Sequence, residues 1–199
     1  MNKIECVYNV YNNVLEMLQN RDYKITTSYH LTFKQFKKKY INNNYNFSLS
    51  HKVQAHRIYV IFSLNNKAKL QNIKQLLTET TELFSTEKDQ VLIILNTKPN
   101  NIIIKYIEKS IYKESVELFW LSILRINITN HQLQPTFTLL TEKEKQELLQ
   151  KYNIKIQNLP KMSIQDPICK YYKYPKHSIV KIIRKNKESI STEFYRYIS

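Results

Sequence analysis

Residues 159–184 read LPKMSIQDPICKYYKYPKHSIVKIIR, and this stretch determines how the C-terminal part of the chain is interpreted. Its prolines, Pro160, Pro167 and Pro175, indicate a tightly bent backbone, because proline fixes φ and removes an N–H donor. The apolar run Ile179–Arg184 predicts a strand. Thr192–Ile198 predicts a second strand, so we expect the chain to end in a hairpin.

Upstream of this stretch, Thr141 and Glu144 have the spacing of a capping box, which predicts a helix that runs to about Tyr152. The pattern of residues along the sequence changes near residues 132–136. We therefore expect two domains, at 1–134 and 135–199. The second would be a small α+β domain with one helix and a hairpin.

The N-terminal part alternates strand-like and helix-like segments. Short apolar or β-branched runs predict strands at Arg57–Leu64, Gln90–Leu95 and Val116–Ile128. Apolar residues at steps of three and four predict helices at 4–18 and 69–79. A capping box formed by Thr32 and Gln35 predicts a helix over 32–40, and 102–110 is a further candidate helix. Strand, helix and strand in this order indicate an α/β domain with a parallel core.

The composition excludes several classes of enzyme. The chain has 199 residues, a formal net charge of +15 and no glycine. A Walker loop, a dinucleotide-binding GxGxxG turn and a GxSxG nucleophile elbow all need glycine, so none can exist in standard form. Cys6 and Cys169 are too few for a four-cysteine zinc site or a secreted disulfide framework. The longest apolar runs are too short to span a bilayer, and residues 1–18 contain no signal-peptide core, so we expect a soluble intracellular protein without a membrane partner.

Candidate catalytic groups all have simpler interpretations. His51 and His56 lack a third ligand at metal-site spacing. Cys169 precedes His177, but nothing orients that base, and the cysteine lies in an apolar context. Glutamates at 142, 144 and 147 fit helix capping and pairing within a helix. We therefore expect no catalytic residue, metal or cofactor in this chain.

Lysines interleaved with aromatic residues are the remaining signal. Lys37–Lys39 lie between Phe36 and Tyr40, and lysines alternate with tyrosines over 170–176. This pattern is compatible with tracking a phosphate backbone and stacking on bases. It is equally compatible with a solvated lysine-rich surface that reflects AT-rich codons. The residues alone leave both interpretations open.

The C-terminal motifs resemble a known family. Leu159–Met162, Asp166-Pro167, Lys170-Tyr171 and Ile179–Arg184 occur in the order found in the assembly domain of the fifth subunit shared by eukaryotic RNA polymerases I, II and III. Archaeal RNA polymerases contain a shorter counterpart of that fifth subunit. Tyr195, Arg196 and Ile198 fit the family's closing strand. The N-terminal half is collinear with the eukaryotic jaw domain, which the archaeal counterpart lacks.

The resemblance implies a non-catalytic subunit of a multisubunit DNA-directed RNA polymerase. Its assembly domain would dock on the largest subunit, and its jaw would approach downstream double-stranded DNA. The implied DNA-facing turn is Thr97, Lys98, Pro99, Asn100 and Asn101. The implied assembly residues are Leu159, Pro160, Lys161, Asp166, Pro167, Lys170, Tyr171, Lys181, Ile183, Arg184, Tyr195 and Arg196.

Departures from the family pattern concern glycine and arginine. Lys173, His177 and a position near Ile190 stand where the family has glycine. A left-handed backbone there would cost a residue with a Cβ about 1 kcal/mol or more, so we expect the final hairpin to be re-routed. Lys170 replaces the expected arginine, which would turn a bidentate contact into a point-charge contact.

Two alternatives to a polymerase subunit stay open. A stand-alone basic nucleic-acid-binding protein would bind DNA with a steep salt dependence. A nuclease or other hydrolase would need a metal site or a carboxylate cluster, which the sequence does not suggest. For the turn at 97–101, the alternative is an ordinary strand-to-helix connection. For Lys161, Asp166, Lys181 and Arg184, the alternative is local stabilisation of the hairpin.

The coding bias bears on localisation. AT-rich, glycine-free coding indicates either a large DNA virus or an AT-rich protist. We favour the virus, whose protein would act in virions and in the host cytoplasm. A cellular version would be mainly nuclear.

Overall fold

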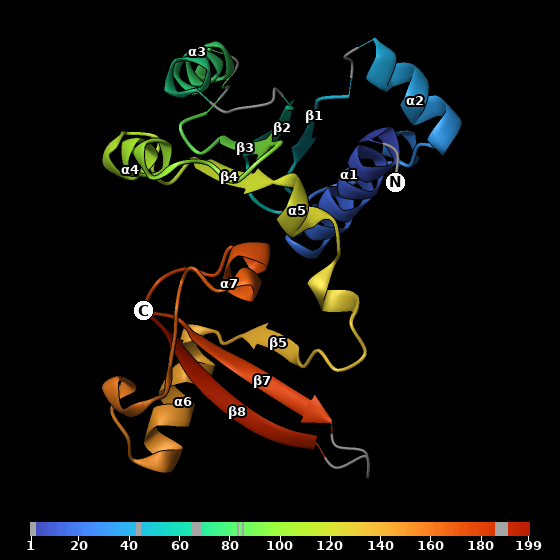
Figure 1. Cartoon of the computed structure of the whole chain (residues 1–199). Helices are drawn as coiled ribbons and strands as arrows, with labels where there is room; N and C mark the ends of the chain where they lie inside the picture. Colours follow the sequence, from blue (N-terminus) through green and yellow to red (C-terminus); the bar gives the residue numbers. More distant parts are fainter. Residues whose placement is uncertain (1–2, 43–44, 65–68, 83, 85, 186–190) are drawn as a thin grey trace. The chain divides into compact units, whose positions relative to one another are not determined.

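The computed structural model describes residues 3–42, 45–64, 69–82, 84, 86–185 and 191–199. Backbone contacts divide the chain into two units, Met1–Ile126 and Asn127–Ser199 (Figure 1). The sequence placed the boundary at 134/135, and the structure assigns residues 127–134 to the second unit. The reason is local: the Asn127 side-chain amide donates to the Tyr171 hydroxyl (3.3 Å), and Ile128 packs on that unit's core.

The N-terminal unit contains a four-stranded sheet of order β1-β2-β3-β4. Its strands are β1 (Phe47–Ser50), β2 (Arg57–Ser63), β3 (Gln90–Leu95) and β4 (Val116–Trp120). Strands β2, β3 and β4 are parallel, which confirms the predicted parallel core, and β1 adds an antiparallel edge strand.

The predicted strand at Val116–Ile128 is wrong in its second half. Strand β4 ends at Trp120, and helix α5 (Leu121–Leu124) follows at once. The apolar residues Leu121 and Leu124 are three positions apart, so a helical turn buries both. The Asn13 amide donates to the Leu124 carbonyl (2.8 Å) and ties this turn to the first helix.

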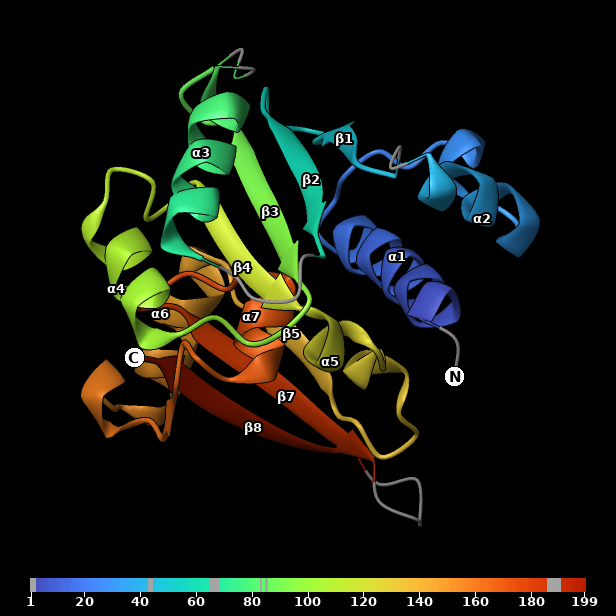
Figure 2. The same cartoon turned by 45° about the horizontal axis from the view of Figure 1, so that its top comes forward.

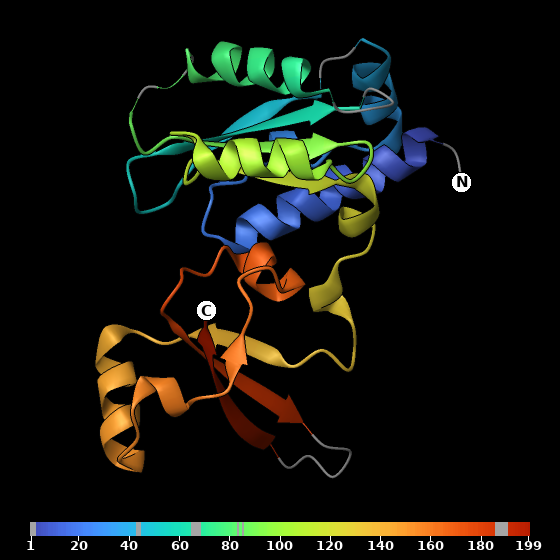
Figure 3. The same cartoon turned by 60° about the vertical axis from the view of Figure 1, so that its left-hand side comes forward.

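Helices cover both faces of this sheet (Figures 2 and 3). On one face, α3 (Leu70–Thr81) and α4 (Asn101–Lys109) pack on Val91, Ile93 and Leu95. On the other face lies α1 (Lys3–Asn20), whose Tyr11 ring stacks on Phe62 of β2. The short helix η1 (Thr27–Tyr29) and helix α2 (Phe33–Ile41) follow α1 along the chain. Because both faces are covered, residues 91–95 of β3 are all buried, as the continuous apolar run predicted.

A buried ion pair fixes the end of α1 to the sheet. The Arg21 guanidinium donates to both carboxylate oxygens of Glu117 on β4, at 3.0 Å each. The Arg21 side chain is only 4% exposed. Removing one partner of such a pair would leave a buried charge without its counterpart, which typically costs several kcal/mol.

The C-terminal unit is built on the predicted hairpin. Strands β7 (Ile179–Lys185) and β8 (Ser191–Ile198) pair antiparallel from Ile179↔Tyr197 to Lys185↔Ser191. β5 (Thr136–Leu139) and β6 (Lys161–Met162) complete a sheet of order β5-β7-β8-β6. The predicted re-routing at Ile190 lies outside the described residues.

Two helices cover the two faces of this hairpin (Figure 3). Helix α7 (Pro167–Tyr172) packs near Val180, Ile182 and Ile198, whereas α6 (Glu142–Tyr152) packs near Ile179 and the rings of β8. The capping box predicted for α6 is present, with Thr141 and Glu144 in reciprocal contact. The short helices η2 (Ile128–Asn130) and η3 (Ile156–Asn158) lie in the connections.

Two of the positions where the family has glycine adopt the left-handed backbone. Lys173 has φ 53° and ends α7, and His177 has φ 65° just before β7. The His177 imidazole Nδ1 is hydrogen-bonded to the Tyr197 hydroxyl of β8, which helps to hold this conformation. The chain therefore tolerates the left-handed geometry at these two positions without glycine.

This tolerance has a measurable cost. We expect Lys173→Gly to have a free energy of unfolding about 1 kcal/mol higher than that of Lys173→Ala, because only glycine adopts this φ without a Cβ clash. Both variants lose the lysine side chain, so their difference isolates the backbone. Chemical denaturation of the two variants measures it. Equal stability, or a more stable alanine variant, would contradict the strain.

Candidate functional site

The implied DNA-facing turn lies where β3 ends and α4 begins. Asn100 caps α4, since its side-chain oxygen accepts from the Ile103 amide (3.0 Å). Pro99 is buried beneath the turn, whereas Thr97, Lys98, Asn100 and Asn101 are exposed. The Lys98 ammonium lies 6.0 Å from the centre of the Trp120 ring, at the end of β4. Pro99 and Asn100 thus hold the turn, and the other three residues are available to a ligand.

This turn occupies a favourable edge of the sheet. It lies at the carboxyl ends of parallel strands, where open α/β sheets commonly bind ligands. The first turn of α4 adds backbone N–H groups with partial positive charge. An anionic ligand is therefore the kind that this turn accommodates best.

On the hairpin of the C-terminal unit, Lys181 and Tyr195 form a local network on the face of α6. The Lys181 ammonium pairs with the Glu193 carboxylate, and the Tyr195 hydroxyl donates to the same carboxylate (2.9 Å). The hydrogen bond from Lys181 lowers the pKa of Glu193 and is also the main cause of the raised pKa of Lys181. Contacts of this kind favour local hairpin stabilisation as the role of Lys181.

The opposite face of the same hairpin carries an exposed cation–ring pair. The Arg184 guanidinium lies over the Phe194 ring, 5.3 Å from its centre. Phe194 is 44% exposed although it sits in a regular ladder opposite buried Ile182. Sequence reasoning identified Arg184 but missed Phe194. The two-residue alternation along β8, which places Phe194 on the face of Ile198, is the signal that could have found it.

Other implied assembly residues serve mainly the fold of the unit. Leu159 and Tyr171 are buried, and Asp166 caps α7 by accepting from the Ile168 amide (2.9 Å). The Pro160 carbonyl accepts from the Tyr197 amide, and the Arg196 guanidinium donates to the Lys161 carbonyl. Lys170 and Ile183 are half-buried. The assembly residues whose side chains are exposed are Pro160, Lys161, Pro167 and Arg184.

The tyrosines interleaved with lysines do not form a base-stacking platform. The rings of Tyr172 and Tyr174 stack on each other with centres 5.1 Å apart, and Tyr171 packs edge-on against Tyr172. Burial raises the pKa of Tyr172 and, more strongly, that of Tyr174. The structure thus uses these rings in the core around α7, which removes the stacking interpretation of this segment.

His51 and His56 pack on each other rather than around a metal. Their ring centres are 4.9 Å apart, and His56 Nε2 contacts the Tyr23 hydroxyl (3.0 Å). His51 Nδ1 accepts two backbone amides of the following turn. Within the described residues, no group of three metal-ligating side chains comes together, and no helix is long and apolar enough to cross a membrane.

Cys169 is a core residue of α7. Its side chain is buried against the apolar face of the hairpin, and this burial raises the pKa of the thiol to about 11. A thiol with that pKa is almost entirely protonated at neutral pH, so it is a poor nucleophile.

We therefore expect thiol reagents to modify half-buried Cys6 in the native chain and to leave Cys169 unmodified until the chain unfolds. Mass spectrometry of chain treated with reagent, with and without urea, measures both positions. A Cys6→Ser variant isolates Cys169. Equal modification of Cys169 in native and unfolded chain would contradict its buried, protonated state.

Comparison with known proteins gives concordant matches in both units. The family domain described as RNA polymerase Rpb5, N-terminal domain, matches residues 2–80, and RNA polymerase Rpb5, C-terminal domain, matches residues 126–198. The chain is 28% identical to the Arabidopsis thaliana protein named DNA-directed RNA polymerases IV and V subunit 5B, over 98% of this chain and 92% of the relative. It is also 28% identical to the Dictyostelium discoideum DNA-directed RNA polymerases I, II, and III subunit rpabc1, over 92% of each chain.

These matches agree with the motif order at 159–184 and with the two units of the structure. They extend over both units, so the similarity is not confined to the C-terminal motifs. The chain belongs to the Rpb5 family of DNA-directed RNA polymerase subunits.

Proposed function

We propose that this chain docks on the largest subunit of a multisubunit DNA-directed RNA polymerase through its C-terminal unit and contributes no catalytic group of its own. The observation that carries the docking proposal is the exposed Arg184–Phe194 pair on the hairpin. The metal ions and carboxylates for nucleotidyl transfer would belong to the larger subunits.

The Arg184–Phe194 pair has the properties of an interface anchor. Arginine and aromatic residues are enriched among the side chains that dominate binding energy. The pair sits on a ladder whose described part pairs without interruption, so little conformational entropy would be lost when a partner covers it. The rest of the hairpin is already packed, since α6 covers the opposite face and α7 covers Val180, Ile182 and Ile198 on the same face.

The N-terminal unit would approach downstream duplex DNA through the turn after β3. Thr97, Lys98 and Asn101 are exposed members of that turn whose side chains do not cap α4. A lysine and two polar side chains beside a helix N-terminus suit phosphate oxygens, and such contacts position a duplex without reading its sequence. Pro99 and Asn100 would keep the turn in place.

A stand-alone basic nucleic-acid-binding protein is the second candidate, favoured by the net charge of +15. Its weakness is the burial of the tyrosines around α7, which removes one predicted stacking surface. For localisation, the AT-rich coding supports a viral polymerase in virions and host cytoplasm. A cellular member would act mainly in the nucleus.

The docking proposal predicts a specific loss of assembly. Affinity purification of the tagged chain from its native source, washed at high salt, should recover the two largest polymerase subunits in stoichiometric amounts. The double variant Arg184→Ala, Phe194→Ala should reduce that recovery about tenfold or more, since anchor residues commonly contribute 2 kcal/mol or more. Quantitative mass spectrometry measures the recovery.

The matched control is a second cation–ring pair in the same unit. The Lys151 ammonium lies 5.5 Å from the centre of the Tyr152 ring on α6. Lys151→Ala, Tyr152→Ala should leave recovery unchanged. Equal recovery of the polymerase subunits with the unmodified chain and with both double variants would contradict the proposed anchor. Recovery of nucleic acid alone, lost as salt rises, would favour the stand-alone binder instead.

The DNA proposal predicts a change in salt dependence. In the assembled polymerase, Lys98→Gln should make the plot of log affinity for downstream duplex against log salt shallower by about 0.9, because one phosphate contact is lost. Lys105→Gln is the control, because it removes the same charge from the exposed surface of α4, beyond the turn. Fluorescence anisotropy over a salt series measures the slope for each of the two variants. An unchanged slope for Lys98→Gln would remove this residue from the DNA contact.

A further inference from the structure

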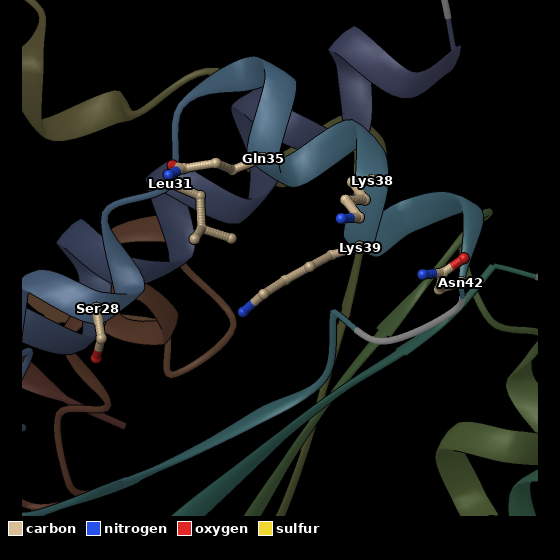
Figure 4. Close-up of a pocket in the computed structure, with 6 residues that line it drawn as sticks. All are labelled: Ser28, Leu31, Gln35, Lys38, Lys39 and Asn42. Atoms are coloured by element: carbon tan, nitrogen blue, oxygen red, sulfur yellow. The ribbon is translucent and has the colours of Figure 1, made fainter.

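A hollow in the N-terminal unit lies between η1 and α2, and none of the residues implied in assembly or DNA contact lines it. It is lined by Ser28, Leu31, Gln35, Lys38, Lys39 and Asn42 (Figure 4). Its volume of about 450 Å³ is in the range of small-ligand sites, and the hollow is open to solvent. Most of the lining surface is apolar, with Leu31 as one wall, whereas the other lining residues carry polar or cationic ends.

Helix α2 is strongly basic. Its sequence, FKQFKKKYI, has four lysines and no acidic residue, and all four are exposed. The ion pairs found in the described part of the chain all lie elsewhere. The helix dipole favours Lys38 and Lys39 in the last turn. It opposes Lys34 near the start of the helix, so helix stability alone does not account for this concentration of charge.

The lining also offers hydrogen-bond donors. The Gln35 side-chain oxygen accepts from the Thr32 amide (2.9 Å) and hydroxyl (3.0 Å) in the capping box at the start of α2. Its amide nitrogen is therefore the group left to donate outward. Figure 4 shows the extended Lys39 side chain reaching from α2 toward the side of the hollow formed by Leu31 and Ser28. A ligand that supplies acceptors and negative charge would match this lining.

Two observations weigh against a nucleic acid as that ligand. Two of the three aromatic residues of α2 are engaged inside the unit: Phe36 is fully buried, and the Tyr40 ring stacks on Tyr45 with centres 5.3 Å apart. The third, Phe33, is 37% exposed but packs edge-on against Tyr8 with ring centres 5.4 Å apart. A single strand would therefore find one partly exposed ring on this helix and no row of rings for successive bases. A duplex is a wide convex rod, whereas this site is a local depression beside a nine-residue helix.

We propose that the hollow between η1 and α2 binds an acidic segment of a partner protein. Aspartate or glutamate carboxylates would meet Lys38, Lys39 and the Gln35 amide. An apolar side chain of the same segment would cover Leu31. This surface adds a docking function to the polymerase subunit, and it does not depend on the Arg184–Phe194 contact or on the DNA-facing turn.

The test uses the full chain and labelled synthetic probes. A peptide in which Asp and Glu alternate with Leu should bind, as measured by fluorescence anisotropy. The same peptide with Asn and Gln in place of the acids should not. Lys38→Gln, Lys39→Gln should weaken binding of the acidic peptide about fivefold or more, because two charge contacts are lost. A Leu31→Ser variant should weaken it further.

The matched control removes two lysines from another helix of the same unit. Lys105 and Lys109 are exposed on α4, and Lys109 lies in its last turn, as Lys38 and Lys39 do in α2. Lys105→Gln, Lys109→Gln should leave peptide binding unchanged. Equal weakening in the two double variants would show a general charge effect and overturn the site. So would failure of the acidic peptide to bind, or tighter binding of a DNA duplex or single strand whose affinity falls with Lys38→Gln, Lys39→Gln.

Discussion

The antiparallel pairing of β7 with β8 is the interaction on which the C-terminal unit depends. Each strand alternates its side chains between two faces, so this one ladder supports two separate apolar clusters, one under α6 and one under α7. The same alternation leaves Arg184 and Phe194 at the surface beside buried Ile182. A one-residue slip of register would exchange the two faces, bury the cation and expose the core. Packing and the proposed docking surface therefore constrain the same register.

The N-terminal unit follows a comparable rule with a parallel sheet. Strand β3 is covered on both faces, and the helices on either side of it fix where the chain leaves the sheet. The turn at 97–101 is placed by buried Pro99 and by the Asn100 cap of α4, which leaves Thr97, Lys98 and Asn101 exposed at the carboxyl edge. Absence of glycine does not prevent tight geometry, since Lys173 and His177 adopt left-handed backbone in the other unit.

Periodicity and capping signals predicted the helices that bury one apolar stripe and the strand that is buried on both faces. The run at Gln90–Leu95 and the capping boxes at Thr32 and Thr141 were sufficient for β3, α2 and α6. Short elements whose stability comes from tertiary contacts were missed, among them β1, β5 and α5. Helix α7 had a readable start in Asp166-Pro167, but three nearby prolines suggested only a bend. For the site, residue identity predicted Arg184. Its partner Phe194 and the hollow beside α2 could be recognised only from the spatial arrangement of the residues.

In the proposed assembly, the C-terminal unit of this Rpb5-family chain is held against the largest polymerase subunit. A cryo-electron microscopy reconstruction of the polymerase purified through this chain tests it most directly. We expect density for the C-terminal unit packed on the largest subunit, with Arg184 and Phe194 covered at the contact. A reconstruction in which that face of the hairpin points to solvent, or in which the unit contacts a different subunit, would contradict it.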